Sequence, residues 1–267
     1  MNPADEMIIG GLFFILGSIV GSFLNVCIVR LPHEKSVVFP GSHCVHCQKP
    51  IPWYDNIPLV SYFVLGAKCR FCQQRISIRY WIVELLTGIS FFLFYRYFGL
   101  TWVLLPYLVF HCGLIVATFV DLEHRIIPDQ ISVGGMLVGL IFSFLLPQLH
   151  GTSSHLFALG RSLLGILIGG GSIYAMGMLG DFLFKKESMG GGDVKLLAMA
   201  GSFLGWQMAI LAFFIAPFFG AVLGIIVKIR TKESVIPYGP FLSLGALISL
   251  FWGNKIIHWL LYNYGLG

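Results

Sequence analysis

The chain has 267 residues and a formal net charge of +5, with 57% hydrophobic and 11% charged residues and a mean hydropathy of +0.85. Soluble domains carry about 25% charged residues, so this composition excludes an ordinary soluble globular protein. Because a helix of about 20 apolar residues crosses a bilayer, the composition predicts an all-α polytopic membrane protein.

Long apolar runs predict about eight transmembrane helices. The first run, 7–29, is too long for the apolar core of a cleavable signal peptide, and no cleavage site is evident. The run 194–204 is too short to cross a bilayer untilted, so 194–228 either crosses twice or forms a re-entrant hairpin. The remaining helices are expected at 79–98, 100–120, 130–147, 161–184, 206–228 and 239–262.

Residues 30–78 form the only sizeable polar segment, and they are rich in Cys, Pro and Gly. We therefore expect three parts: a first span at 1–29, a small extramembrane domain at 30–78 and a membrane-embedded domain at 79–267. Threading the expected spans puts 14 of the 17 Lys and Arg residues on the side of the polar segment. Since positive charge marks the cytoplasmic side, this domain is predicted to be cytoplasmic.

Two Cys-x-x-Cys pairs in this domain, "CVHC" at 44–47 and "CRFC" at 69–72, predict a metal site. Four thiolates on two tight turns suit tetrahedral zinc, and a structural metal would supply folding energy to a loop too small for a large core. An iron centre and free thiols are the alternatives, while a reducing compartment disfavours disulfides. The expected ligands are Cys44, Cys47, Cys69 and Cys72.

The stretch "FVDLEHRIIPDQIS" at 119–132 places Asp121 where an apolar run ends. A carboxylate at membrane depth is costly and is a functional candidate by default, the alternative being an interfacial residue that reaches toward water. Asp129 follows the helix-breaking Pro128 and is interpreted as the N-cap of the next helix.

The stretch "MGGGDVK" places Asp193 directly after three glycines. Asp193 can simply begin a helix, where negative charge is favoured. Alternatively, the glycines let an extended substrate strand approach the backbone. The expected topology puts Asp121 and Asp193 at the cytoplasmic ends of spans, where they can meet. Two close carboxylates share a proton and can direct water at a peptide carbonyl, as in aspartic proteases. The glycines are Gly190, Gly191 and Gly192.

A proton-coupled membrane transporter that uses an aspartate pair is the alternative function. Transporter sites lie near the bilayer midplane, and many transporter folds contain internal repeats. Here the acids fall at the ends of spans, the sequence shows no internal repeat, and the four-cysteine domain has no role in transport. The peptidase interpretation is therefore preferred.

In combination, these motifs resemble the type IV prepilin peptidases, the bifunctional leader peptidase/N-methyltransferases of the GxGD aspartyl protease group. The resemblance covers nearly the whole chain. Ser188 and Trp81 depart from it, since the family usually has Gly and Pro at these positions. The matching stretches are "GSFLNVCIVRLP" (21–32), "SHCVHC…NIPLVSY…CRFCQQRISIRY" (42–80), "VDLEHRIIPD" (120–129), "MGGGDVKLLAM" (189–199) and "IPYGPFL" (236–242).

The resemblance implies that Asp121 and Asp193 are the catalytic pair and that the four cysteines bind the metal. It implies cleavage of type IV prepilins or type II secretion pseudopilins after a Gly, at the cytoplasmic face of the bacterial inner membrane. The partners are thus these substrates and the lipid bilayer, with no nucleic acid. It also implies S-adenosylmethionine-dependent methylation of the new N-terminus, although a member with peptidase activity alone is an open alternative.

The residues that bind S-adenosylmethionine are unknown from the sequence. A sulfonium can sit on aromatic rings or near a carboxylate. Glu84 is the one carboxylate considered for this role, against pairing with Arg79 or with a neighbouring helix. The particular substrate, the pathway and the oligomeric state do not follow from the sequence.

Overall fold

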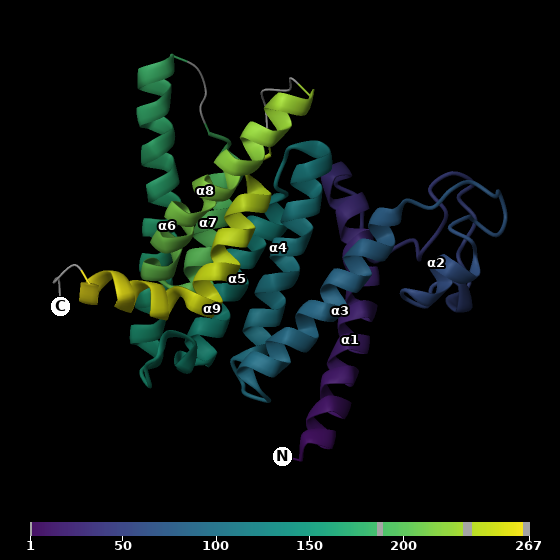
Figure 1. Cartoon of the computed structure of the whole chain (residues 1–267), viewed down its shortest axis with the longest axis horizontal. Coiled ribbons are helices and arrows are strands. Elements are labelled where there is room, and N and C mark those ends of the chain that lie inside the picture. The colour runs from purple at the N-terminus through teal and green to yellow at the C-terminus, as the bar shows by residue number, and fades with distance from the viewer. Residues whose placement is uncertain (1, 186–188, 232–236, 264–267) are drawn as a thin grey trace. The chain divides into compact units, whose positions relative to one another are not determined.

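The computed structural model describes residues 2–185, 189–231 and 237–263 (Figure 1). Within these ranges the chain is helical and contains no β-strand. Two of the 14 basic residues counted on the side of the polar segment, Lys186 and Lys232, lie outside the described residues. So do Ser188 and Ile236 of the family stretches. The α-helices are α1 (Pro3–Arg30), α2 (Val60–Val64), α3 (Ile78–Phe98), α4 (Leu104–His124), α5 (Asp129–Leu145), α6 (His155–Phe184), α7 (Gly191–Leu204), α8 (Trp206–Thr231) and α9 (Gly239–Asn263), and short 3-10 helices occupy Leu31–His33, Trp53–Asp55 and Pro147–His150.

Each of the eight expected apolar runs forms a helix, which confirms the prediction of an all-α polytopic membrane protein. Five helices are long and apolar enough to cross a membrane, namely α1, α3, α4, α6 and α9. Two apolar helices are shorter, α5 and the segment Trp206–Val222 of α8. With 14 residues, α7 is about 21 Å long, which is less than the roughly 30 Å hydrocarbon core of a bilayer.

The chain forms two compact units, Met1–Leu108 and Val109–Gly267. In the first unit α1 packs along α3. Arg30, the last residue of α1, is buried, and its guanidinium donates hydrogen bonds to the carbonyl oxygens of Ser36 (3.1 Å) and Gly41 (3.0 Å). The end of the first span therefore fixes the start of the polar segment. The expected three parts, 1–29, 30–78 and 79–267, were defined by their roles rather than by contacts, and they stay a prediction.

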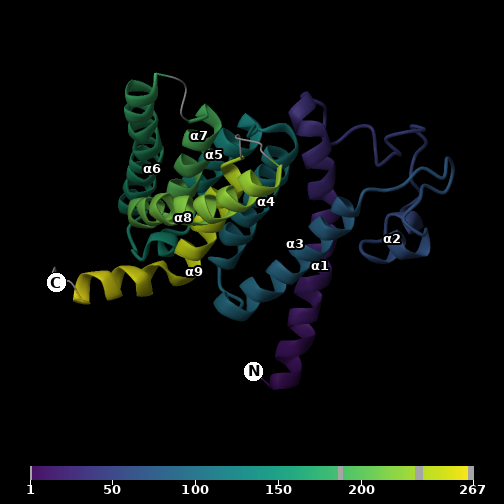
Figure 2. The same cartoon turned by 45° about the horizontal axis from the view of Figure 1, so that its top comes forward.

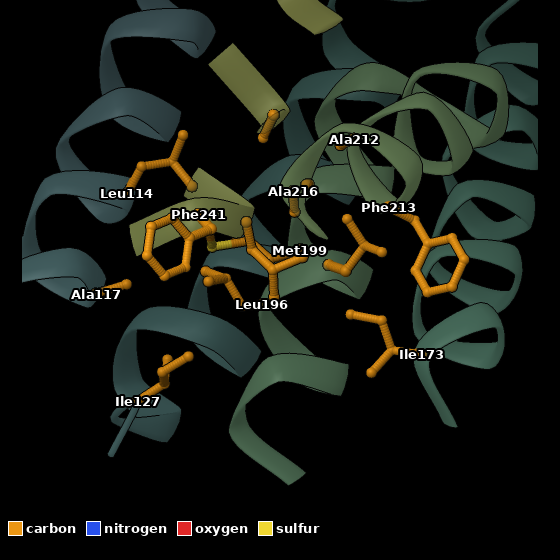
Figure 3. Packing of buried hydrophobic residues seen from close by; sticks show 14 of the residues in the cluster. Leu114, Ala117, Ile127, Ile173, Leu196, Met199, Ala212, Phe213, Ala216 and Phe241 are labelled. Atoms are coloured by element: carbon orange, nitrogen blue, oxygen red, sulfur yellow. The ribbon is translucent and has the colours of Figure 1, made fainter. Parts of the chain in front are cut away.

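In the second unit α7 is the central helix. It packs against α5, α6, α8 and α9, and every residue from Leu196 to Phe203 is buried. Figure 3 shows side chains from α4, α6, α8 and α9 meeting around Leu196 and Met199 of α7, with Phe241 on one side and Ile173 on the other. In lipid, close packing and hydrogen bonds rather than exclusion of water hold such helices together.

Two glycines bring the backbones of α6 and α7 into contact. A Cβ added at Gly165 would lie 2.0 Å from the carbonyl oxygen of Gly201, and one added at Gly201 would lie 2.0 Å from that of Gly165. One turn along α6, a Cβ at Gly169 would lie 2.6 Å from the carbonyl oxygen of Leu197. Glycine spaced by four residues on one helix face permits this approach.

We expect Gly201→Val to lower the free energy of unfolding by at least about 2 kcal/mol, because backbone on both sides cannot move aside. Thermal unfolding in detergent measures this effect. The matched control is Gly171→Val on α6, where an added Cβ would meet no described atom within 4 Å. Equal stability of the two variants would show that the α6–α7 contact is looser than the structure has it.

Serine hydroxyls satisfy the carboxyl end of α7. Ser143 and Ser162 both donate to the carbonyl oxygen of Ser202, at 3.2 and 2.7 Å. His150 lies 2.8 Å from the Ser143 hydroxyl through its Nε2. The last carbonyls of a helix have no partner within the helix. These side chains therefore fix the C-terminal end of α7, the end far from Asp193.

Candidate functional site

Asp121 lies inside α4 rather than after the end of a span. Its side chain is buried, with the residue 6% exposed, and Oδ2 accepts a hydrogen bond of 2.8 Å from the Gly239 amide at the start of α9. A Cβ at Gly239 would lie 2.8 Å from the same oxygen, so glycine is needed for this approach. The expected run ended at residue 120, because hydropathy falls at the polar residues through which α4 continues to His124.

Asp193 lies in the first turn of α7. Gly190 is the N-cap residue, and the Asp193 amide donates to its carbonyl oxygen at 3.1 Å. The two carboxylates lie close enough for the charge of Asp121 to act on Asp193. The structure therefore brings together two acids that are 72 residues apart in the sequence. The helix-start position of Asp193 and its nearness to Asp121 coexist.

The prediction that Asp129 is a helix N-cap is wrong. Pro128 occupies the N-cap position with φ −61° and ψ 137°, and Asp129 is the first residue of α5. Its carboxylate instead accepts two hydrogen bonds from the Lys195 ammonium, at 2.7 and 2.9 Å. Both side chains are largely exposed, 63% for Asp129 and 42% for Lys195. Proline fits the extended N-cap backbone, which leaves the acid in the first turn, where its charge is favoured.

The three glycines before Asp193 have different surroundings. A Cβ at Gly192 would lie 3.2 Å from the Cβ of Ile127, so this glycine makes room for the segment that follows α4. A Cβ at Gly190 would lie 3.4 Å from Asp193 Oδ2, and one at Gly191 would meet no described atom within 4 Å. Their role in admitting a substrate backbone stays a prediction.

The residues at the start of α9 complete the site, and reasoning from single residues missed them. The Gly239 amide donates a hydrogen bond to Asp121, and Tyr238 lies close enough to Asp193 for the two to interact electrostatically. The motif "IPYGPFL" was noted only as a family stretch. A signal was present, because Gly239-Pro240 is typical of a helix start, where backbone amides point outward without partners.

The four predicted metal ligands form one cluster in the first unit. Cys44 Sγ lies 3.8 Å from Cys72 Sγ, Cys47 Sγ lies 4.0 Å from Cys69 Sγ, and all four sulfurs lie within 4.8 Å of one another. Tetrahedral zinc with Zn–S bonds of about 2.3 Å needs sulfurs about 3.8 Å apart. The residues therefore fit zinc, and four thiolates leave no open position on it.

The two Cys-x-x-Cys pairs adopt the same turn. In each, the amide of the first cysteine donates to the carbonyl five residues later, and the amide four residues later donates back to the cysteine carbonyl. Gln48 and Gln73 follow the second cysteines with φ of +58° and +56°. Each turn therefore points two sulfurs toward the same place.

An ion pair supports the second pair of cysteines. Arg70 donates to both carboxylate oxygens of Asp55, at 2.6 and 2.5 Å. The hydrogen bonds and charge of Arg70 lower the pKa of Asp55. Because that pKa is lower in the folded than in the unfolded chain, the pair stabilises the domain at neutral pH. This stabilisation is lost as the pH falls through the folded pKa.

Glu84, considered for the methyl donor, has partners within the first unit. Its Oε2 accepts a hydrogen bond of 2.8 Å from the Leu59 amide, and its carboxylate also interacts with Ser22 of α1. Contact with a neighbouring helix, the alternative given above to binding the methyl donor, therefore accounts for Glu84. Trp81, the departure from the family pattern, packs edge-on against Phe63 of α2.

Comparison with known proteins shows the family. Residues 15–98 match the bacterial peptidase A24 N-terminal domain, and residues 108–225 match the type IV leader peptidase family. A Pseudomonas aeruginosa protein named prepilin leader peptidase/N-methyltransferase is 35% identical over 271 residues, which cover 91% of this chain and 90% of that protein. The chain belongs to the type IV leader peptidase family.

Other members of the leader peptidase family give the same result. A Myxococcus xanthus prepilin leader peptidase/N-methyltransferase is 42% identical over 83% of this chain, which spans 64% of that protein. An Escherichia coli protein named type 4 prepilin-like proteins leader peptide-processing enzyme is 33% identical over 88% of this chain and 91% of that protein. No solved structure matches the chain at a significant level. Family membership confirms the resemblance seen in the sequence.

Proposed function

We propose that this leader peptidase family member is an intramembrane aspartic endopeptidase that removes the leader of type IV prepilins or pseudopilins and then N-methylates the new N-terminus. The observation that carries the peptidase part is that Asp121 and Asp193 lie in one unit, close enough for the charge of Asp121 to act on Asp193. Its relatives named prepilin leader peptidase/N-methyltransferase support both activities. Nothing in the site favours the alternative of a transporter.

In this mechanism the two carboxylates hold one proton between them. The ionised carboxylate takes a proton from water, and the protonated one donates a hydrogen bond to the scissile carbonyl oxygen. The Gly239 amide holds Oδ2 of Asp121. We therefore expect Oδ1 to be the oxygen that meets the water and the substrate. The Gly190–Gly192 backbone is the place where we expect the substrate strand to lie.

The cofactors have separate roles in the proposal. Zinc on Cys44, Cys47, Cys69 and Cys72 holds the extramembrane domain together and takes no part in hydrolysis. S-adenosylmethionine supplies the methyl group, and no residue of this chain is assigned to it.

The activity test is incubation of the detergent-solubilised protein with a prepilin peptide that has a basic leader ending in Gly, followed by Phe. Mass spectrometry should show release of the leader without S-adenosylmethionine, and the addition of a methyl group to the mature product with it. Cleavage without methylation would indicate a member with peptidase activity alone. No cleavage would contradict the proposal.

We also propose that the site faces the cytoplasm across the bacterial inner membrane, because positive charge gathers on that side of the expected topology. Glu34 and Ser153 are exposed, so a cysteine at either position should react with a soluble thiol reagent. In intact cells an impermeant reagent should label Ser153→Cys only, and inverted vesicles should reverse the result. The opposite pattern would overturn the orientation.

A further inference from the structure

The short helix α2 presents an uncovered apolar surface in the extramembrane domain. Val60, Phe63 and Val64 are 54%, 67% and 73% exposed. These three residues, called here the α2 surface, lie at positions i, i+3 and i+4, so they share one face of the helix. Three large apolar side chains exposed together on one turn indicate a contact that the isolated chain does not show.

Two contacts fix how far along α3 this helix lies. The Leu59 amide, directly before α2, binds the carboxylate of Glu84, and the Phe63 ring lies 5.6 Å from the Trp81 ring. Glu84 is the seventh residue of α3, about 9 Å from the start of that helix. Figures 1 and 2 both show α2 to the side of the beginning of α3.

If α3 enters the bilayer through its first turns, this position brings α2 to the membrane surface. Helix α3 is long and apolar enough to cross a bilayer, and its first two turns also carry the polar residues Arg79 and Glu84. The polar segment leaves α1 at Arg30 and returns at Ile78, so both of its ends are held where spans end. A segment level with the first two turns of a span lies at the depth of headgroups and upper acyl chains.

The charge of the same segment suits an anionic surface. Residues 31–77 contain five basic and two acidic residues, a net charge of +3 (five minus two). Lys49, Lys68 and Arg75 are exposed. Basic residues beside exposed aromatic and aliphatic side chains are typical of segments that lie in the interface of an anionic leaflet.

We propose that α2 is an interfacial anchor, whose apolar surface of Val60, Phe63 and Val64 inserts into the anionic leaflet beside α3. The exposed cations Lys49, Lys68 and Arg75 then contact lipid headgroups, and Trp81 sets the depth of Phe63. The anchor holds the four-cysteine domain against the membrane. It depends on the spans alone and is independent of the proposed peptidase activity.

Site-specific photo-crosslinking tests this anchor in the full-length protein. Benzoylphenylalanine replaces Val64 in one variant and the exposed Val45, between the cysteines of the first pair, in the other. Each protein is placed in nanodiscs of phosphatidylcholine mixed with phosphatidylglycerol and irradiated. We expect a yield of lipid adducts at 64 at least about five-fold above that at 45, and a lower yield at 64 in pure phosphatidylcholine.

The outcomes separate lipid from a protein partner. Repeating the irradiation with a prepilin peptide present should leave the lipid adduct at 64 dominant. An adduct at 64 with the peptide in place of lipid would overturn the anchor and make α2 a docking surface for substrate. Equal lipid yields at 64 and 45 would also overturn it, and equal yields in the two lipids would contradict the role of the cations. Unchanged zinc content and a monodisperse elution profile verify that each variant is folded.

Discussion

We expect Asp121→Asn and Asp193→Asn each to lower the rate of leader cleavage by at least about a thousandfold. Both changes nearly preserve volume and remove the ionisable group, so neither variant can share a proton between two carboxylates. The Gly239 amide can still donate to the amide oxygen of an asparagine at 121, so the fold around α9 should persist. The initial rate of leader release, followed by mass spectrometry, measures the loss.

Asp129→Asn is the matched control for this experiment. Asp129 belongs to the same stretch as Asp121, and its partner Lys195 lies two residues beyond Asp193. Because exposed ion pairs contribute only about 0–1 kcal/mol, the variant should retain cleavage within roughly five-fold of wild type.

Methylation of an already cleaved peptide should survive both catalytic substitutions if the two reactions use different groups. Near wild-type cleavage by Asp121→Asn or Asp193→Asn would leave Asp193 as a helix start only.

We expect the purified protein to carry about one zinc per chain, and Cys44→Ser or Cys72→Ser to abolish it. Zinc binding by such sites contributes roughly 10 kcal/mol or more to folding, and residues 40–75 have few buried apolar side chains to replace it. Metal analysis and hydrogen exchange of residues 40–75 measure the loss of metal and of structure. Slow inactivation by a chelator would then reflect unfolding of this domain.

The control for the metal prediction is Cys112→Ser, which removes a cysteine of α4 outside the four-sulfur cluster. It should keep its zinc and its exchange protection at residues 40–75. Full zinc retention by both Cys44→Ser and Cys72→Ser would rule out a site with four cysteine ligands.

The helices could be predicted, and the two acids could be selected as candidates, because membrane burial strongly constrains the sequence. Polar backbone groups in lipid must be paired inside the protein, and a helix pairs them within one segment, so long apolar runs such as 79–98 are expected to be helices. Asp121 was selected as a candidate because a carboxylate at the end of such a run is costly to place in a membrane. The four-cysteine cluster could also be predicted, because both pairs have the Cys-x-x-Cys spacing and both form the same turn.

Apart from the meeting of Asp121 with Asp193 and of the two cysteine pairs, contacts between distant segments could not be predicted. The amide that binds Asp121 comes from Gly239, which is 118 residues away, and an amide carries no residue-specific signal. The ion pair of Asp129 with Lys195 was not predicted, because the local sequence suggested that Asp129 is a helix N-cap. Pro128 occupies the N-cap position instead. The α6–α7 contact at Gly165 and Gly201 similarly depends on which helices become neighbours.

The most direct test of the central claim compares cleavage by the two single aspartate variants with that of the double variant Asp121→Asn/Asp193→Asn. If the two carboxylates act as one unit, removing either removes the mechanism, and the double variant should have the same residual rate as each single one. We therefore predict equal residual rates for all three proteins under the same conditions. Losses that multiply in the double variant would mean that Asp121 and Asp193 act independently, and would contradict a shared catalytic site.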